Sequence, residues 1–394
     1  MSKTFSQNKI NRNPLIISII VLLIGAYYLS GSVSGTQASL LIVGGLLGVS
    51  LYFASFGFTY AWRVFISDRR SGGLRAQMIM LALGVILFFP FLSQGTIFGK
   101  AVVGNVEAIS LSVVVGAFLF GIGMQLGGGC GSGTLFTVGG GNTRMIITLL
   151  FFIVGSVIGA YTFSTWSAWP AFAPYSEIQN WGLWPALITN LIVFALIYFI
   201  TSALEKRKHG KIQPISHTEN NQQSLIYGPW PLVWGAIALV LLNFATLALA
   251  GKPWGVTSAF AIWGAKILYL NGIDTTQWAY FAKHPNVITD SVFKNVTSVM
   301  DFGIILGAVI AASAAGKFAP VWRLSSNAIL TAIIGGLLLG FGARLAFGCN
   351  IGAYFSGIIS GSVHAWLWLV CAFIGSSVGV YLRPLFELPV EKRS

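Results

Sequence analysis

Long apolar runs separated by short polar stretches dominate the chain. The longer runs approach the roughly 20 residues that a helix needs to cross a bilayer. They recur too often for one cleaved signal peptide to explain them. The sequence therefore predicts an all-α integral membrane protein. The apolar segments lie at 14–30, 39–62, 76–93, 108–126, 144–164, 183–203, 230–250, 254–271, 297–316, 326–347 and 363–383.

Composition and charge agree with lipid as the solvent. Of the 394 residues, 55% are hydrophobic and 8% are charged, whereas soluble domains carry about 25% charged residues. The net charge of +13 comes from basic clusters between apolar runs, which indicates positive-inside topology and no nucleic-acid partner. We expect these clusters and both chain ends on the cytoplasmic side of a bacterial inner membrane. The clusters are residues 67–75, residues 204–211, Lys317 with Arg323, and residues 391–393.

The two halves of the chain resemble each other. Residues 116–136 align with residues 335–355 without gaps. A weaker similarity pairs residues 57–61 with residues 255–259. The sequence therefore predicts an internal repeat. The identical positions are Gly116, Leu119, Gly121, Gly123, Leu126, Gly129, Cys130, Gly133 and Phe136 in the first half.

The repeat suggests an organisation for the whole chain. If every basic cluster is cytoplasmic, segment 254–271 enters the bilayer without crossing it, and the repeats have inverted orientations. Inverted repeats commonly place a substrate site near the bilayer midplane, so we expect re-entrant Gly-Cys loops that meet there. The predicted units are an N-terminal helix (1–38), a first repeat (39–165), a connecting helix and cytoplasmic linker (166–229), a second repeat (230–384) and a tail (385–394).

The repeated Gly-Cys loops are the candidate binding site. Glycine costs about 1 kcal/mol relative to alanine inside a helix, and irregular backbone at membrane depth needs protein or water around it. Free amides on such turns bind anions, and a thiol adds a weak donor and a soft sulfur. A soft sulfur oxyanion fits both features. The candidate residues are Gly129, Cys130, Gly131, Gly348, Cys349 and Asn350.

The cysteines also allow other interpretations. Buried cysteine is usually inert. We interpret Cys371 as an inert buried residue, because its repeat equivalent is Phe151 and not a cysteine. Zinc needs about four ligands, and only His364 lies near either loop cysteine in sequence, so no metal or cofactor is expected. A disulfide between Cys130 and Cys349 is a further alternative.

A charged donor and a neutral donor occupy equivalent repeat positions before the cysteines. Arg344 lies five residues before Cys349, and its equivalent is Gln125. An arginine inside a membrane segment is a functional-site hypothesis by default. The alternatives are an ion pair with Asp301 or snorkelling of Arg344 to an interface.

The sequences GGGCGSG at 127–133 and FGARLAFGCNIGAYFSGI at 341–358, followed by SVHAWLW, resemble the paired signatures of the YeeE/YedE family. This family transports sulfur compounds, chiefly thiosulfate, across membranes, and the resemblance covers residues 40–385. It implies that Cys130 and Cys349 line the path and hydrogen-bond thiosulfate through their thiols. It also implies that Ser67 stands where many members have a cysteine, and that a TusA-like sulfur-handling protein is a cytoplasmic partner.

The expected function is uptake of thiosulfate by stepwise relay along thiols and loop amides, without enzymatic chemistry. No Walker A motif is present, so direct use of ATP is not expected. Two alternatives stay open: transport of another sulfur or selenium species, and a membrane protein that cycles between dithiol and disulfide.

Overall fold

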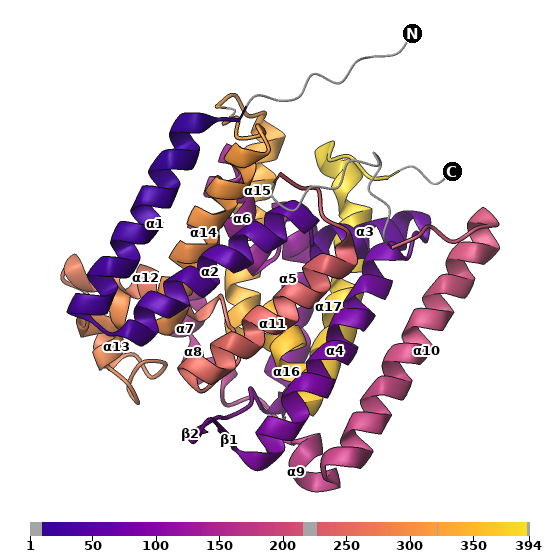
Figure 1. Ribbon diagram of the computed structural model, residues 1–394, viewed down its shortest axis with the longest axis horizontal. Helices are drawn as coiled ribbons and strands as arrows, with labels where there is room; N and C mark the ends of the chain where they lie inside the picture. The colour runs from indigo at the N-terminus through magenta and orange to yellow at the C-terminus, as the bar shows by residue number, and fades with distance from the viewer. Residues whose placement is uncertain (1–9, 216–226, 321, 392–394) are drawn as a thin grey trace.

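The computed structural model describes residues 10–215, 227–320 and 322–391, and helices make up most of it (Figure 1). Within this part of the chain, ten spans are long and apolar enough to cross a membrane, so the predicted multi-pass membrane protein is confirmed. The spans are Arg12–Ser32 (α1), Gly35–Asp68 (α2 and α3), Gly72–Gln94 (α4), Leu111–Gly139 (α5 and α6), Thr143–Tyr161 (α7), Leu183–His209 (α10), Leu232–Ala250 (α11), Val296–Ala314 (α14), Ser326–Ile358 (α15, η3 and α16) and Val363–Phe386 (α17 and η4).

Shorter elements connect these spans. Helix α12 has 13 residues, and at 1.5 Å per residue it is about 20 Å long, which is less than the hydrocarbon thickness of a bilayer. The other short helices are α8 (Phe163–Trp166), α9 (Glu177–Trp181), η1 (Thr275–Gln277), α13 (Asn286–Thr289) and η2 (Val292–Lys294), and α12 itself is Ser258–Leu270.

Two short ladders correct the all-α prediction. Strands β1 (Thr96–Ile97) and β2 (Lys100–Ala101) pair antiparallel, as do β3 (Ile109–Ser110) and β4 (Ala171–Phe172). The β1–β2 turn holds Phe98 and Gly99 at positive φ, as a two-residue hairpin turn requires. Hydropathy does not detect strands of two residues, because alternation needs more positions to become visible.

The predicted segment 39–62 is not a single helix. Helix α2 (Gly35–Ala54) ends where Ser55 adopts a left-handed φ of 46°, and α3 (Phe58–Asp68) begins three residues later. Both pieces are apolar, so the hydropathy pattern continues across the break. The break follows from backbone geometry, since a left-handed residue ends an α-helix.

Glycine allows the central helices to approach backbone to backbone. A Cβ atom added at Gly375 of α17 would lie 2.0 Å from the Phe118 carbonyl oxygen of α5. A Cβ atom added at Gly155 of α7 would lie 2.3 Å from the Leu337 carbonyl oxygen of α15. Small residues at such contacts are the usual means of helix association in lipid, and here each holds a loop-bearing helix, α5 or α15, against a neighbouring helix.

The helix contacts follow the sequence repeat. Helix α7 packs on α15, and the equivalent helix α17 packs on α5. The equivalent helices α12 and α3 behave in the same way, since α12 packs on α7 and α3 packs on α17. The equivalent helices α2 and α11 do so too, since α2 packs on α14 and α11 packs on α4. Helices α1 and α10 flank the bundle on opposite sides (Figure 1), α1 against α14 and α10 against α4. Equivalent helices therefore exchange partners between the two halves.

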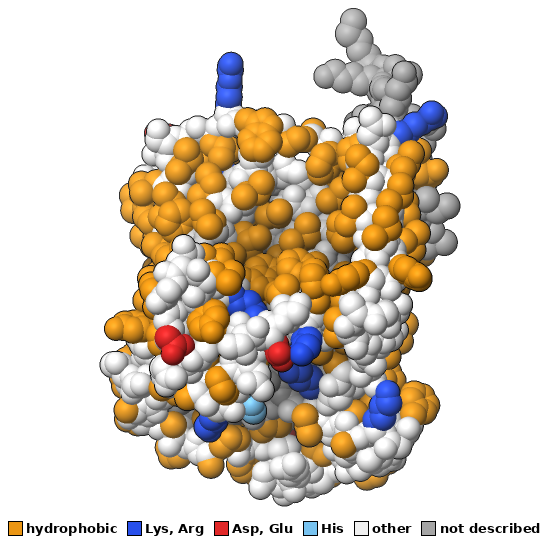
Figure 2. Space-filling view, turned by 90° about the vertical axis from the view of Figure 1, so that its left-hand side faces the viewer, with side chains coloured by type: hydrophobic (Ala, Val, Ile, Leu, Met, Phe, Trp, Pro, Cys, Tyr) orange, Lys and Arg blue, Asp and Glu red, His pale blue; other side chains and the backbone are white. Residues whose placement is uncertain are grey.

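The surface is mostly apolar. Figure 2 shows a broad hydrophobic face with few charged side chains, most of them in its lower half. Within the predicted connecting helix and linker at 166–229, helix α10 extends to His209. Residues 216–226 of that linker, residues 1–9 and residues 392–394 of the predicted tail lie outside the described residues.

Substituting Gly375 with alanine should destabilise the protein. The new Cβ atom would force α5 and α17 apart, and overpacking of this kind costs about 1–3 kcal/mol. Thermal unfolding in detergent should show a lower Tm for Gly375→Ala. The matched control is Gly31→Ala, because nothing lies within 4 Å of a Cβ atom there. Equal Tm values for the two variants would contradict the backbone contact.

Candidate functional site

Each Gly-Cys loop interrupts a helix and starts another at its cysteine. In the first loop Gly128 adopts a φ of 95°, and Cys130 is the N-cap of the nine-residue helix α6 (Gly131–Gly139). In the second loop Gly348 adopts a φ of 152°, and Cys349 precedes the π-helix η3 (Asn350–Phe355). The first amides of a helix lack intrahelical partners, so both cysteines lie at a donor-rich helix start.

The two loops contact each other. A Cβ atom added at Gly131 would lie 3.0 Å from Cys349 Sγ and 3.0 Å from Thr257 Cγ2. Cys130 Sγ accepts a hydrogen bond from the Gly133 amide at 3.4 Å and lies 3.6 Å from Ser132 Oγ. Both cysteines are buried free thiols, so the alternative disulfide is absent. The structure thus brings together the two loops that the repeat singled out.

A vestibule of about 280 Å³ lies beside the second loop. Gly348 and Gly352 contribute to its wall, together with the basic side chains of Arg344 and Lys252. The Arg344 side chain is oriented by two hydrogen bonds, from Nη2 to Thr257 Oγ1 and from Nη1 to the hydroxyl of Tyr280, both 2.7 Å long.

The alternative pairing of Arg344 with Asp301 is wrong, because neither carboxyl oxygen of Asp301 has a hydrogen-bond partner in the described structure. Snorkelling does not describe Arg344 either, since the residue is buried.

Glu107 also lines the vestibule. It lies between β2 and β3, outside the predicted spans, and burial raises the pKa of its carboxyl above the usual range. A raised pKa means that this negative charge is lost at a higher pH than for an exposed glutamate. The vestibule therefore becomes more positive as the pH falls.

Gln125 forms a contact equivalent to that of Arg344. Its Nε2 donates to the Thr59 carbonyl at 3.1 Å and to Ser376 Oγ at 2.6 Å. Thr59 and Thr257 occupy matching positions in the weak similarity between residues 57–61 and 255–259, so the same positions meet in both halves. Unlike Arg344, Gln125 lies in the packed interior, and it does not line the vestibule.

Several polar atoms around the loops have no hydrogen-bond partner in the described structure. Both side-chain polar atoms of Asn350 are unpaired, as are the Tyr354 hydroxyl, the Thr59 hydroxyl and the Trp368 indole nitrogen. Buried polar groups are nearly always paired with protein or water. Such a concentration beside two thiols is typical of a site that takes water or a polar ligand.

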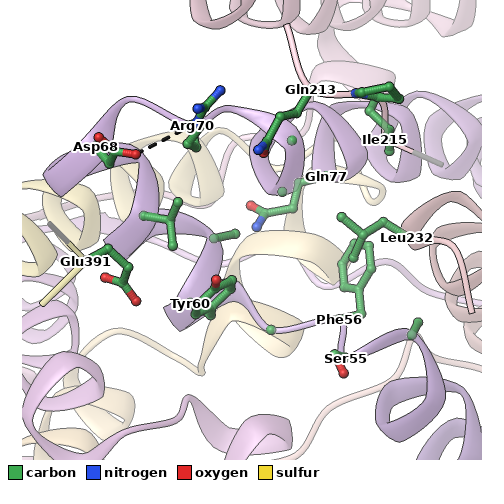
Figure 3. Close-up of a pocket in the computed structure, with 17 residues that line it drawn as sticks. Ser55, Phe56, Tyr60, Asp68, Arg70, Gln77, Gln213, Ile215, Leu232 and Glu391 are labelled. Atoms are coloured by element: carbon green, nitrogen blue, oxygen red, sulfur yellow. Dashed lines mark ion pairs between the residues drawn. The ribbon is translucent and has the colours of Figure 1, made fainter. Parts of the chain in front are cut away.

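A larger cavity of about 720 Å³ extends along α3 from Gly57 to Asp68 (Figure 3). Tyr60, Gln77 and Glu391 line it, together with Asp68 and Arg70, which form an ion pair at 3.7 Å. This is the end of the molecule at which α1 begins and α17 ends (Figure 1).

An aromatic layer links the larger cavity to η3. We use this name for Phe58, Trp62, Tyr354 and Trp368. Trp62 Nε1 donates to Gln77 Oε1 at 3.0 Å, and the Trp62 ring lies 6.2 Å from the ring of Tyr354. Tyr354 stacks on Trp368 with an angle of 6° between the rings. Bulky rings therefore fill the space between Gln77 and the thiol-bearing loop.

Two other predicted residues lie away from the loops. Ser67 is nine residues along α3 from Phe58, about 14 Å at the helical rise, and its hydroxyl donates to the Arg63 carbonyl. Cys371 is a buried free thiol on α17. Among the described residues no group of His, Cys, Asp and Glu side chains could hold a metal ion.

Sequence reasoning missed Thr257 and Tyr280, which orient Arg344, and Lys252. The match of residues 57–61 with residues 255–259 contains the signal for Thr257, because Thr59 occupies the equivalent position. No sequence signal points to Tyr280, since it lies in the irregular segment between α12 and α14.

Comparison with known proteins shows related chains. The family profile described as Sulphur transport matches residues 53–378. The Thiosulfate transporter TsuA of Spirochaeta thermophila is 30% identical over 356 residues, which cover 85% of this chain and 96% of that protein. The Thiosulfate transporter TsuA of Escherichia coli (strain K12) is 26% identical over 364 residues, covering 87% and 94%.

A shorter match connects the chain to the Probable transporter YedE of Escherichia coli (strain K12). The two are 35% identical over 164 residues, which are 41% of this chain and 40% of that protein. The chain therefore matches less than half the length of that relative.

Replacing Glu107 with glutamine should remove the pH-dependent loss of folding stability that comes from burying a charged carboxylate. Because the folded-state pKa is raised, the folded protein binds more protons than the unfolded chain between the two pKa values, so stability falls as pH rises through that window. The Tm of Glu107→Gln should exceed that of the unmodified protein at pH 7, and the difference should vanish near pH 4. Equal Tm values at pH 7 would contradict this account.

Proposed function

The chain belongs to the Sulphur transport family, and from that premise we propose that it carries thiosulfate across the membrane. The names of its TsuA relatives support this substrate. The observation that carries the proposal is the contact between the two loops that bear the buried free thiols of Cys130 and Cys349, beside a vestibule lined by Arg344 and Lys252.

The donors around the thiols suit a soft dianion. Transfer of an unpaired ion into hydrocarbon costs tens of kcal/mol, so donors must replace water at each narrow point. Helix-start amides, the Arg344 guanidinium and thiol S–H groups provide them. Thiols are weak donors, which suits transport because a site that binds too firmly does not release its ion.

The transport path runs from the vestibule to the larger cavity. The anion enters beside Arg344, passes Cys349 and Cys130, and leaves past Asn350 once the aromatic layer moves. Ser67 lies on α3, further toward the larger cavity, where a hydroxyl would act late in the path. No covalent intermediate forms, so both thiols stay reduced.

The repeats span the membrane in opposite directions. Five membrane-length spans, formed by α2 with α3, α4, α5 with α6, α7 and α10, separate the start of α2 from the start of its repeat equivalent α11, and an odd number of crossings inverts the second repeat relative to the first. In this arrangement α12 and the two Gly-Cys loops are re-entrant and meet near the midplane.

The larger cavity lies on the cytoplasmic side of a bacterial inner membrane, with both chain ends. Moving a dianion into a negative cell costs about 4.6 kcal/mol per 100 mV. A TusA-like partner that consumes thiosulfate at this cavity would lower the internal concentration.

Alanine at either loop cysteine should abolish most uptake. A hydrogen bond to a charged group contributes about 1.5–3 kcal/mol, so Cys130→Ala and Cys349→Ala should each lower uptake roughly tenfold or more. The measurement is radiolabelled thiosulfate uptake into proteoliposomes, with sulfate, sulfite and selenite as competitors. The matched control is Cys371→Ala, which should keep normal uptake because Cys371 lies away from the loops. Normal uptake by both loop variants would refute the thiol path.

Serine variants separate transport from redox chemistry. A hydroxyl also donates a hydrogen bond, so Cys130→Ser and Cys349→Ser should retain part of the uptake. A protein that cycles between dithiol and disulfide would lose all activity when either cysteine is replaced by serine. A number of free thiols that changes during turnover, measured by thiol titration, would favour that alternative.

Substitution of Arg344 should weaken binding more than it slows transport. Arg344→Gln removes the buried cation of the vestibule wall, and loss of a charge-assisted contact should raise the KM for thiosulfate roughly tenfold. Concentration-dependent initial rates measure this effect. Gln125→Ala is the comparison, because Gln125 lies outside the vestibule. An unchanged KM for Arg344→Gln would exclude the guanidinium from substrate binding.

A further inference from the structure

Asp301 is a buried acid with no partner in the described structure. It lies in the second turn of α14 and is 0% exposed, and neither carboxyl oxygen accepts or donates a hydrogen bond within the described residues. An isolated carboxylate at such a place would cost tens of kcal/mol. The side chain is therefore neutral at rest and carries a proton.

Asp301 lies next to the candidate site. Thr297, one helical turn earlier on the same face of α14, lines the vestibule and accepts a hydrogen bond from Ser258 at 3.2 Å. On the other side, Ile305, one helical turn later on the same face of α14, lies against α6, the helix that Cys130 caps, because a Cβ atom added at Gly139 would lie 2.5 Å from the Ile305 carbonyl oxygen. The acid is thus placed between the vestibule wall and α6.

The elements packed against α14 do not neutralise Asp301. Helix α6 contains no titratable side chain and follows Cys130. Lys266 donates to the carbonyls of Ile288 and Asp290, and Lys294 pairs with the Asp290 carboxylate. None of these side chains is hydrogen-bonded to Asp301. The titratable groups of the other packed elements are Arg12, Tyr27 and Tyr28 of α1, Tyr52 of α2, Lys266 and Tyr269 of α12, and Lys294 of η2.

We propose that Asp301 binds and releases one proton in each transport cycle, so that the anion and the proton cross together. This inference rests on the proposed anion transport. A dianion beside Cys349 favours the protonated acid, and by reciprocity the protonated acid favours the dianion. After the anion leaves toward the larger cavity, water that follows it solvates the carboxylate while the proton dissociates, and the carboxylate then takes a new proton from vestibule water on the Thr297 side.

Coupling is tested by accumulation under a pH gradient. Proteoliposomes with the voltage held at zero by potassium and valinomycin are placed at external pH 6 and internal pH 7. One coupled proton should concentrate labelled thiosulfate about tenfold inside. The readout is the steady-state ratio of internal to external thiosulfate concentration, because the coupling stoichiometry sets this ratio. The rate of uptake is not used, because protonation of Glu107 also alters it as pH changes.

Asp301→Asn should abolish accumulation and retain exchange. The variant should equilibrate to equal concentrations, while counterflow of labelled thiosulfate without a gradient continues and shows that it is folded. Asp290→Asn makes the same chemical change at the surface and should accumulate about tenfold. Accumulation by Asp301→Asn equal to that of the unmodified chain would overturn the inference.

A second readout needs no variant. A pH dye trapped inside should report acidification when thiosulfate is added outside to the unmodified protein. Uptake without acidification and without accumulation would overturn proton coupling and leave the proposed function intact. No uptake by the folded, unmodified protein under any gradient would overturn both.

Discussion

Close backbone contact between the central helices is the constraint on which the site depends. Two helices that break at a glycine expose amides that lipid cannot satisfy. The breaks are tolerated because α5, α7, α15 and α17 approach until a Cβ atom at Gly155 or Gly375 would touch a carbonyl oxygen of the neighbouring helix. Gly131 lets the first loop reach Cys349 in the same way. Larger side chains at these positions would separate the loops and expose their backbone.

The polar groups at the loops form a graded set of donors. The Arg344 guanidinium is the strongest donor and is oriented by Thr257 and Tyr280, whereas the thiols and the Asn350 amide are weaker donors. Such a gradient suits an anion that is attracted at the vestibule and then released through weaker contacts. Gln125 occupies the repeat position equivalent to Arg344, so the equivalent positions of the two halves differ in charge, and only Arg344 lines the vestibule.

Much of this organisation was predictable from the sequence. Hydropathy identified the membrane spans, because a helix in lipid needs a continuous apolar surface. The repeat identified both Gly-Cys loops, because a residue pattern with glycine at many positions rarely recurs by chance around a cysteine. The break after Ala54 was not predictable from hydropathy, since apolar side chains continue on both sides and a left-handed φ at Ser55 leaves no compositional mark.

The sequence by itself determined that this is a multi-pass membrane protein of two related halves with a cysteine at each equivalent loop, because hydropathy and internal similarity are properties of the chain. Only the tertiary structure decided that the first loop approaches Cys349 at Gly131, that Arg344 binds Thr257 and Tyr280, and that Asp301 has no hydrogen-bond partner among the described residues. These contacts join positions far apart in the chain, and their partners are set by helix packing. Local sequence patterns do not encode the distance between two helices.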